Sequence, residues 1–155
     1  MIKHILIILS TRFPLYHKRR RKETHFKESF LAKRKIHTIR SGYDRWAHNI
    51  DKVISGDFTL SLREWSGRPY DSPQREIASL KEDVGYQRIT MSYDPRTEEL
   101  EVTIDGKPYN DIKRLAANDG LSVEDFKSFM FGASRTLDKQ LFQGIIIHFT
   151  KFRYK

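Results

Sequence analysis

The chain of 155 residues has the length of one ordinary domain, and its 38% hydrophobic and 32% charged residues are typical of a folded globular protein rather than a disordered one. The absence of cysteine excludes a disulfide framework, a thiolate nucleophile and a cysteine-ligated metal, and it fits a cytoplasmic location. The formal net charge of +9 favours an anionic partner.

The positive charge is concentrated in the first quarter of the chain. Residues 1–40 contain 12 lysines and arginines against two glutamates, a net charge of +10, whereas the remainder has 17 cations against 18 anions, a net charge of −1. Within a predicted basic loop around 16–25, five cations are consecutive: Lys18, Arg19, Arg20, Arg21 and Lys22. Because like charges repel, we expect this loop to be flexible when free and to become ordered on a phosphate backbone. The alternative is a solubilising arm.

Hydrophobic spacing predicts the elements of the first half. Residues 2–9 form an apolar run that is too short for a signal-peptide core or a membrane span, so we interpret it as a buried strand. Apolar residues at helical spacing predict a short helix over 26–33 and an amphipathic helix over 43–54, with Trp46 on its buried face and Gly56 as its C-terminal stop. Alternation of apolar and polar residues predicts a strand over 58–63.

The second half combines strands and helices. Strands are predicted over 75–80, 86–93 and 100–104, with a turn at 94–97 and a tight hairpin at Asp105-Gly106. One helix is predicted over 110–118, and a second follows Ser122, which is suited to be its N-cap with Asp125 in the capping-box position. A final strand over 144–152 is apolar on both faces. The chain is therefore expected to form a single α+β domain over 1–155.

One eight-residue segment, Lys33–Arg40, carries four cations, one imidazole and one hydroxyl. A lysine three residues before a threonine, with an arginine two residues further on, suits the binding of an anionic or carbonyl-bearing ligand. Basic segments of this length are also common on solvated surfaces. The segment gains significance from two motifs that come later in the chain: Gly56-Asp57 at the start of a strand, and the sequence REWSGRPY over 63–70.

This ordered set of motifs resembles the ASCH superfamily, whose members are small domains of PUA-like fold. The resemblance covers residues 26–155, and its N-terminal part is similar to the version of the domain found in Bacteroidetes and phage genomes. It implies a mixed, mainly antiparallel β-barrel with flanking short helices. It also implies an RNA- or nucleotide-binding cleft around Lys35–Arg40, with Arg34, His37 and Arg40 in contact with the ligand.

One bacterial branch of the superfamily resembles an amidohydrolase that removes acetyl from N4-acetylcytidine with a lysine, a threonine and a glutamate. The resemblance assigns the first two roles to Lys35 and Thr38, and it puts Asp119, one methylene shorter, in place of the glutamate. A lysine of lowered pKa would act as the base, the hydroxyl as the nucleophile, and Arg40 would stabilise an oxyanion or hold a phosphate. Because residues three apart face opposite sides of a strand, Lys35 and Thr38 cooperate only if the chain turns between them.

Each of these three residues also has a structural interpretation. Lys35 can be a solvated lysine, Thr38 a hydroxyl bonded to the main chain, and Asp119 part of an ordinary Asp-Gly turn between helices. The segment from Arg63 to Tyr70 has two interpretations as well. Arg63, Trp65 and Tyr70 can form a rim where a ring stacks on a base, or the aromatic rings can lock the turn in the core.

Two functions remain open. The first is a module that binds RNA, a nucleoside or a nucleotide. The second is an enzyme, either an amidohydrolase acting on a modified pyrimidine nucleoside or a ribonuclease, with Lys35 and Thr38 central. Binding of another protein through the same face is a third possibility. The histidines lack the spacing of metal ligands, so the sequence predicts neither a metal site nor a cofactor, and it does not indicate an oligomeric state.

Overall fold

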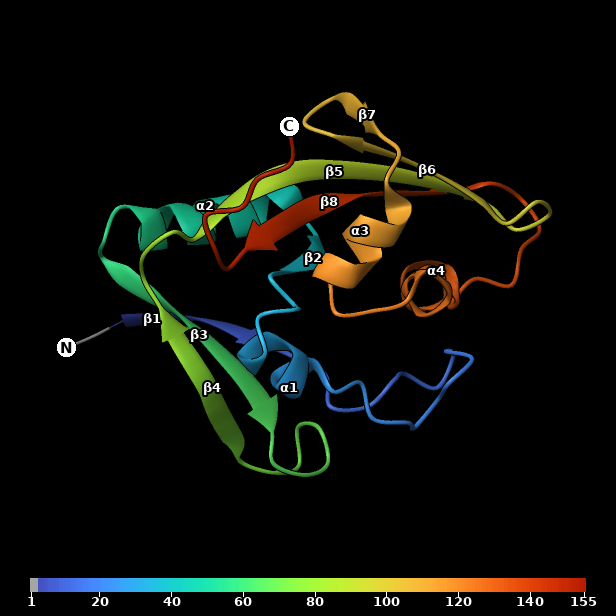
Figure 1. The fold of residues 1–155 in the computed structure, drawn as a ribbon. Helices are drawn as coiled ribbons and strands as arrows, with labels where there is room; N and C mark the ends of the chain where they lie inside the picture. Colours follow the sequence, from blue (N-terminus) through green and yellow to red (C-terminus); the bar gives the residue numbers. More distant parts are fainter. Residues whose placement is uncertain (1–2) are drawn as a thin grey trace.

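The computed structural model describes residues 3–155, whose strands separate into two sheets (Figure 1). The strands are Lys3–Ile8 (β1), His37–Ser41 (β2), Phe58–Trp65 (β3), Gln74–Leu80 (β4), Gly85–Asp94 (β5), Glu99–Ile104 (β6), Lys107–Tyr109 (β7) and Gln140–His148 (β8). The helices are Phe26–Leu31 (α1), Tyr43–Ile54 (α2), Ile112–Asn118 (α3) and Val123–Phe131 (α4). Ile2, the first residue of the strand predicted over 2–9, lies outside the described residues.

The smaller sheet has the order β1-β3-β4, and the larger sheet has the order β2-β8-β5-β6-β7. Only the β1–β3 pair is parallel among the described strands. The predicted α+β class is therefore confirmed, but the structure is not the closed barrel that was expected. Closure requires a ladder between the two sheets, and no such ladder joins them within residues 3–155. Alternation along a strand reveals its buried face but not its neighbour, so the sequence could not exclude this arrangement.

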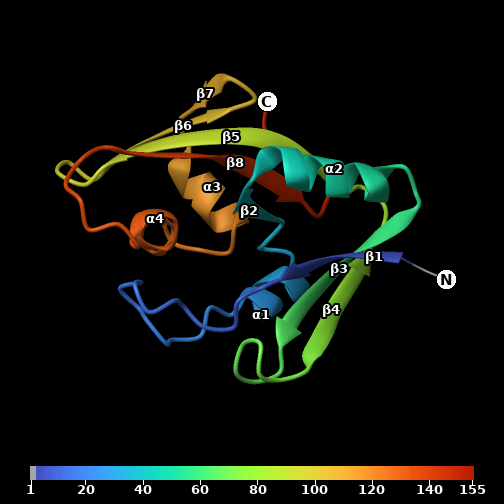
Figure 2. The same ribbon diagram turned by 180° about the vertical axis from the view of Figure 1, so that it is seen from behind.

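Helix α2 connects the two sheets, because it contacts β1 and β3 of the smaller sheet and β5 and β8 of the larger one (Figure 2). Its buried residues are Ala47, Ile50 and Val53, at helical spacing. The predicted bounds are confirmed, and Gly56 follows the helix in a left-handed conformation with φ 91°. Trp46, which was expected in the core, is only half-buried.

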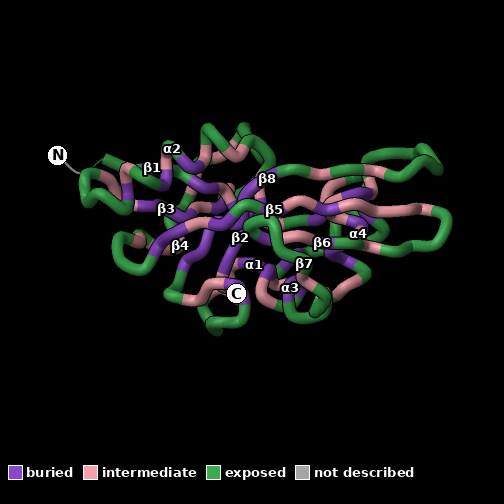
Figure 3. The backbone as a smooth tube through the Cα atoms, turned by 90° about the horizontal axis from the view of Figure 1, so that it is seen from above, coloured by how far each residue is buried: buried purple, intermediate pink, exposed green. Residues whose placement is uncertain are grey.

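The centre of the core is strand β8, where Ile145, Ile146 and Ile147 are fully buried from both faces (Figure 3). The strand predicted over 144–152 is correct in its apolar part, but β8 begins and ends four residues earlier. It begins earlier because Gln140–Gln143 pair with β5 while alternating in exposure, which gives no continuous apolar run. It ends earlier because the chain turns away after His148.

Two local predictions are confirmed at the turns. Asp105 and Gly106 both have positive φ angles, 51° and 79°, as a tight hairpin of this kind requires, and they lead into the short strand β7 that the sequence did not predict. Ser122 caps α4 by accepting a hydrogen bond from the Asp125 N–H at 3.1 Å. The Asp125 carboxylate does not close a capping box, because it binds the Arg19 guanidinium at 2.7 Å.

Candidate functional site

A buried cluster of ionisable side chains lies between β2 and the turn that joins α3 to α4. Lys35, His37 and Asp119 are 2%, 0% and 5% exposed. The Lys35 ammonium donates hydrogen bonds to the Asp119 main-chain oxygen at 2.7 Å and to its Oδ1 at 3.3 Å. It also lies 4.3 Å from the centre of the Phe26 ring. The lysine charge is therefore compensated inside the protein by a carboxylate, a carbonyl and an aromatic face.

The main chain before β2 determines where Lys35 points. Lys33 has a left-handed conformation with φ 63°, and the N–H groups of Arg34 and Lys35 both donate to the Ser29 carbonyl. Lys35 therefore lies in a turn and not in the strand. The rule that residues three apart in a strand face opposite sides does not apply to Lys35 and Thr38. The sequence had required a turn between these two residues, and the structure provides one before the strand begins.

Asp119 and Gly120 form the helix-to-helix turn that their sequence indicates, and the same turn contacts Lys35. Gly120 has φ 82°, which favours glycine. A Cβ at this position would lie 3.2 Å from the Lys35 Cβ and 3.3 Å from the Ser29 hydroxyl. A side chain here would therefore push against the lysine that Asp119 binds.

The electrostatics of the cluster follow from burial and pairing. Burial lowers the pKa of the Lys35 ammonium, although the nearby Asp119 charge opposes that shift. Burial alone would raise the pKa of Asp119, but the Lys35 charge and the His37 hydrogen bond hold it below its ordinary value. Burial also lowers the pKa of His37, so its imidazole is neutral at pH 7. A negative carboxylate thus contacts one cation and one neutral ring.

A chain of hydrogen bonds fixes the tautomer of His37. Its Nδ1 lies 3.2 Å from Asp119 Oδ1, a carboxylate oxygen that can only accept, so Nδ1 carries the proton. Its Nε2 then accepts from the Tyr154 hydroxyl at 2.7 Å, and that hydroxyl accepts from the Asn118 amide at 2.9 Å. His37 is therefore held by hydrogen bonds on both sides, and it does not line the cavity described below.

Sequence reasoning missed Tyr154, which closes this network. Its main-chain N–H donates to Gln87 Oε1 at 2.8 Å, and its carbonyl accepts from Gln87 Nε2 at 2.8 Å. Burial raises the pKa of its phenol. Tyr154 belongs to no helix or strand, so no periodic pattern could have marked it as buried.

A cavity of about 20 Å³ separates this cluster from the surface. Its polar lining includes Lys35, Thr38, Arg40 and Asp119, three of which were the predicted catalytic residues. The Thr38 hydroxyl forms no hydrogen bond within residues 3–155. The volume is sufficient for one water molecule and too small for a nucleoside. The structure thus brings the three residues together around a space that only a small group can enter.

A larger groove of about 720 Å³ adjoins the cavity, and Ser10, Arg40 and Phe129 line both. Its walls come from the end of β1, from α2 and from the loop between β3 and β4. They contain three arginines and three aromatic rings besides Phe129: Arg12, Arg40, Arg68, Trp46, Trp65 and Tyr70. The lining contains no aspartate or glutamate. A cationic groove lined by aromatic rings therefore adjoins the cavity of the buried cluster.

Of the other residues that were predicted to bind the ligand, some line the groove and some do not. Trp65 and Tyr70 line the groove with ring centroids 5.2 Å apart, so they do not lock the core. Arg63 lies outside the groove, since its guanidinium binds the Ser61 hydroxyl at 2.9 Å. Arg34 is exposed and lines no described pocket.

The basic loop was expected to be flexible when free, but it is folded against α4. The Tyr16 hydroxyl donates to the Phe129 carbonyl at 2.7 Å, and the buried His17 ring binds the Asp125 carbonyl at 3.0 Å. Arg19 pairs with the Asp125 carboxylate. None of the five consecutive cations lines the groove. The missed signal was the pair of rings before the cations, Phe13 and His17, which are both buried and stack on each other.

Residues 3–155 contain no cluster of three or more histidine, aspartate or glutamate side chains placed to hold a metal ion. Within the same residues, every helix is too short or too polar to cross a membrane.

Comparison with known proteins found no relative: no family model, no curated protein and no solved structure matches this chain.

Proposed function

We propose that this protein is an ASCH-like domain that binds single-stranded RNA or a nucleotide in the groove beside Arg40. The observation that carries the proposal is the lining of the groove, in which arginines and aromatic rings occur together without any carboxylate. Phosphates are attracted by the cations, and bases of any sequence stack on the rings. The basic loop adds positive charge outside the groove.

The ring pair at the mouth of the groove supports this proposal further. Tyr70 is 90% exposed and Trp65 is half-buried, and their planes are inclined by 48°. An exposed phenol at the tip of a loop contributes little to folding, because it remains in contact with water. Both rings therefore have free faces on which a base can stack, at about 1–3 kcal/mol for each stacked base.

Fluorescence anisotropy with a 5′-labelled octanucleotide of mixed sequence tests the proposal. The wild type is expected to bind with an affinity that falls as salt increases. Removal of one ring and one cation, by Trp65→Ala with Arg68→Gln, should weaken binding by more than the about 1–3 kcal/mol that one stacked base contributes. Arg96→Gln, in the exposed turn between β5 and β6, is the matched control and should bind like the wild type. No binding at low salt would contradict the proposal.

Hydrolysis of an N4-acetylcytidine-like nucleoside is the second candidate, favoured by the unpaired Thr38 hydroxyl in the cavity with Lys35 and Asp119. In this reaction the hydroxyl oxygen attacks the acetyl carbonyl, the bond to N4 breaks, and N4 takes a proton. Water then cleaves the acetyl ester and releases acetate. The cavity of about 20 Å³ must widen toward the groove before an acetyl group can enter, and for this reason binding ranks first.

Cytidine release from N4-acetylcytidine, followed by chromatography, tests this second candidate. Thr38→Val removes the hydroxyl while leaving the Lys35–Asp119 pair intact, and Thr38→Ser restores a hydroxyl. Release by the wild type and the serine variant, but not by the valine variant, would establish the hydrolase. The absence of release from the wild type would exclude this substrate.

A further inference from the structure

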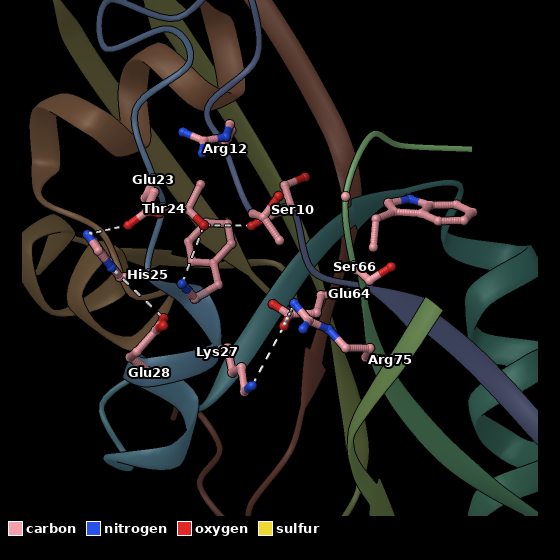
Figure 4. A pocket seen from close by; sticks show the side chains of 14 residues that line it. Ser10, Arg12, Glu23, Thr24, His25, Lys27, Glu28, Glu64, Ser66 and Arg75 are labelled. Carbon is pink, nitrogen blue, oxygen red and sulfur yellow. Dashed lines mark hydrogen bonds and ion pairs between the residues drawn. The ribbon is translucent and has the colours of Figure 1, made fainter. Parts of the chain in front are cut away.

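A second pocket of about 320 Å³ lies beside the groove (Figure 4). It lies between the segment 23–28, which includes the start of α1, and residues of β3 and β4. Five residues line both spaces: Ser10, Thr11, Arg12, Trp65 and Gly67. A molecule that stacks on Trp65 in the groove can therefore extend into this pocket.

The most unusual residue of the pocket is Glu64. It is 7% exposed, and it follows Leu60 and Leu62 at strand spacing on the buried side of β3. Its Oε1 lies 3.3 Å from the Arg75 guanidinium and 3.7 Å from the Lys27 ammonium. Its Oε2 forms no hydrogen bond or ion pair with another described residue. Figure 4 shows this carboxylate between the two cations at the wall of the pocket.

Oε2 is not one of the fully buried side-chain atoms that lack a hydrogen-bond partner, so this acceptor is accessible to solvent. A ligand with an N–H donor can replace water at Oε2 and form a charge-assisted hydrogen bond there. The ligand is restricted further by Lys27 and Arg75, which lie beside Oε1. A ligand atom that approaches these two cations must be a hydrogen-bond acceptor.

The charges that line the two spaces differ. The groove has arginines without carboxylates. The second pocket balances three cations, Arg12, Lys27 and Arg75, with three carboxylates, Glu23, Glu28 and Glu64. A phosphate is therefore attracted to the groove, whereas the second pocket suits an uncharged group with both donors and acceptors.

We propose, on the premise that the protein binds RNA as argued above, that this pocket takes a guanine base whose N1–H and N2–H donate to the Glu64 carboxylate. Guanine alone among the four bases presents two adjacent N–H donors on its pairing edge. Its O6 lies next to N1–H, on the side where Lys27 and Arg75 flank Oε1. The pocket volume falls within the range of small-ligand sites.

The other bases fit this carboxylate less well. Adenine and cytosine each have an amino group beside an unprotonated ring nitrogen, which would face a carboxylate oxygen with its lone pair. Uracil has one N–H between two carbonyl oxygens, one of which would face the carboxylate. Each base therefore provides one donor and one repulsive contact, and Glu64 discriminates against all three.

Anisotropy measurements with three labelled octanucleotides test this inference: one of uridines only, one with a single central guanosine, and one with inosine in place of that guanosine. Inosine keeps N1–H but lacks the 2-amino group. The guanosine octanucleotide should bind about tenfold to a hundredfold more tightly than the uridine one, with inosine between them. Glu64→Gln should remove the preference while leaving uridine binding unchanged. Glu82→Gln, an exposed carboxylate outside the pocket, is the control.

The outcomes separate this inference from the proposed function. If the wild type binds the guanosine and uridine octanucleotides equally, the guanine inference is wrong and RNA binding stands. A preference that persists in Glu64→Gln overturns the inference as well. If no octanucleotide binds at any salt concentration, both proposals fail. The ranking of the three RNAs by the wild type decides the question even if the Glu64 variant does not fold.

Discussion

Asp119 and Glu64 are two of the buried carboxylates among residues 3–155 that have cations beside them, and they differ in how completely they are bonded. Asp119 contacts Lys35 and His37 inside a closed network, and all three side chains are nearly inaccessible. Glu64 is bonded through one oxygen only, and the side chains of Lys27 and Arg75 are 42% and 59% exposed. The difference indicates that the first carboxylate is committed to structure and that the second is available to a ligand.

The comparison also explains why a motif can match a catalytic pattern without establishing catalysis. Lys35, Thr38 and Asp119 converge on one small cavity, as an active site would require. The same contacts hold the turn after α3 against β2, so they contribute to folding as well.

The largest expected effect is the loss of stability in Lys35→Met. Removing the ammonium leaves the buried Asp119 without its hydrogen-bonded cation, and breaking a buried pair in this way costs about 3–5 kcal/mol. Urea unfolding at pH 7 measures the change. Lys27→Met is the matched control, because its partly exposed pair with Glu64 should contribute no more than about 1 kcal/mol. Equal losses in the two variants would remove the distinction between the two clusters.

A second effect is the dependence of stability on pH. Burial lowers the pKa of His37, and burial lowers the pKa of His148 to about 2, so the unfolded chain takes up protons at these residues at a higher pH than the folded protein does. Stability should therefore fall on acidification below pH 6.5, with a slope from His148 that approaches about 1.4 kcal/mol per pH unit and a contribution of the same sign from His37.

The lowered pKa of Asp119 acts in the same direction at lower pH, since its stabilising charge is present above its ordinary pKa and is lost as the pH falls through the folded value. Urea unfolding at several pH values measures the slope. His148→Gln should reduce the slope by the contribution of one histidine. A flat profile between pH 7 and 5 would contradict the lowered pKa of His148.

A smaller effect is expected for RNA binding by Trp65 variants. Trp65→Ala should weaken binding by about 1–3 kcal/mol, because one stacking platform is lost. Trp65→Phe should retain most of the affinity. Since Trp65 lines both the groove and the Glu64 pocket, the alanine variant should lose binding to uridine and guanosine octanucleotides alike, unlike Glu64→Gln. A loss confined to guanosine would show that the ring serves only the second pocket.

The smallest effect should come from the basic loop, none of whose five cations reaches the groove. Lys18, Arg20, Arg21 and Lys22 can be replaced by alanine together, with Arg19 retained because it binds Asp125. The logarithmic salt dependence of binding should become less steep by about 0.7 for each phosphate contact that is lost. An unchanged slope would assign the loop to solubility.

The sequence predicted those parts of the fold that depend on local chemistry. The bounds of α2 follow from the spacing of Ala47, Ile50 and Val53 and from Gly56. The hairpin follows from the Asp105-Gly106 dipeptide, whose positive φ angles the structure confirms. The division into two sheets was not predictable in this way, because pairings such as β2 with β8 join residues about a hundred positions apart.

The candidate site was also predictable only where its residues lie close together in the sequence. The segment Lys33–Arg40, Trp65 and Tyr70 were recognisable because several residue types with chemical potential occur close together in sequence. Tyr154 was not, since its role depends on partners far away in the chain. Glu64 did carry a signal: a glutamate continues the inward-facing positions of Leu60 and Leu62. A charge at such a position is unusual enough to mark a candidate site from the strand pattern alone.

The position of β8 has a consequence for synthesis of the protein. Because β8 lies between β2 and β5, the middle of the larger sheet cannot form until residues 140–148 have left the ribosome. Until then both neighbours present unpaired strand edges, and such edges invite association with other chains. The larger sheet therefore becomes continuous only after β8 has been made, and its two parts are open to association before that point.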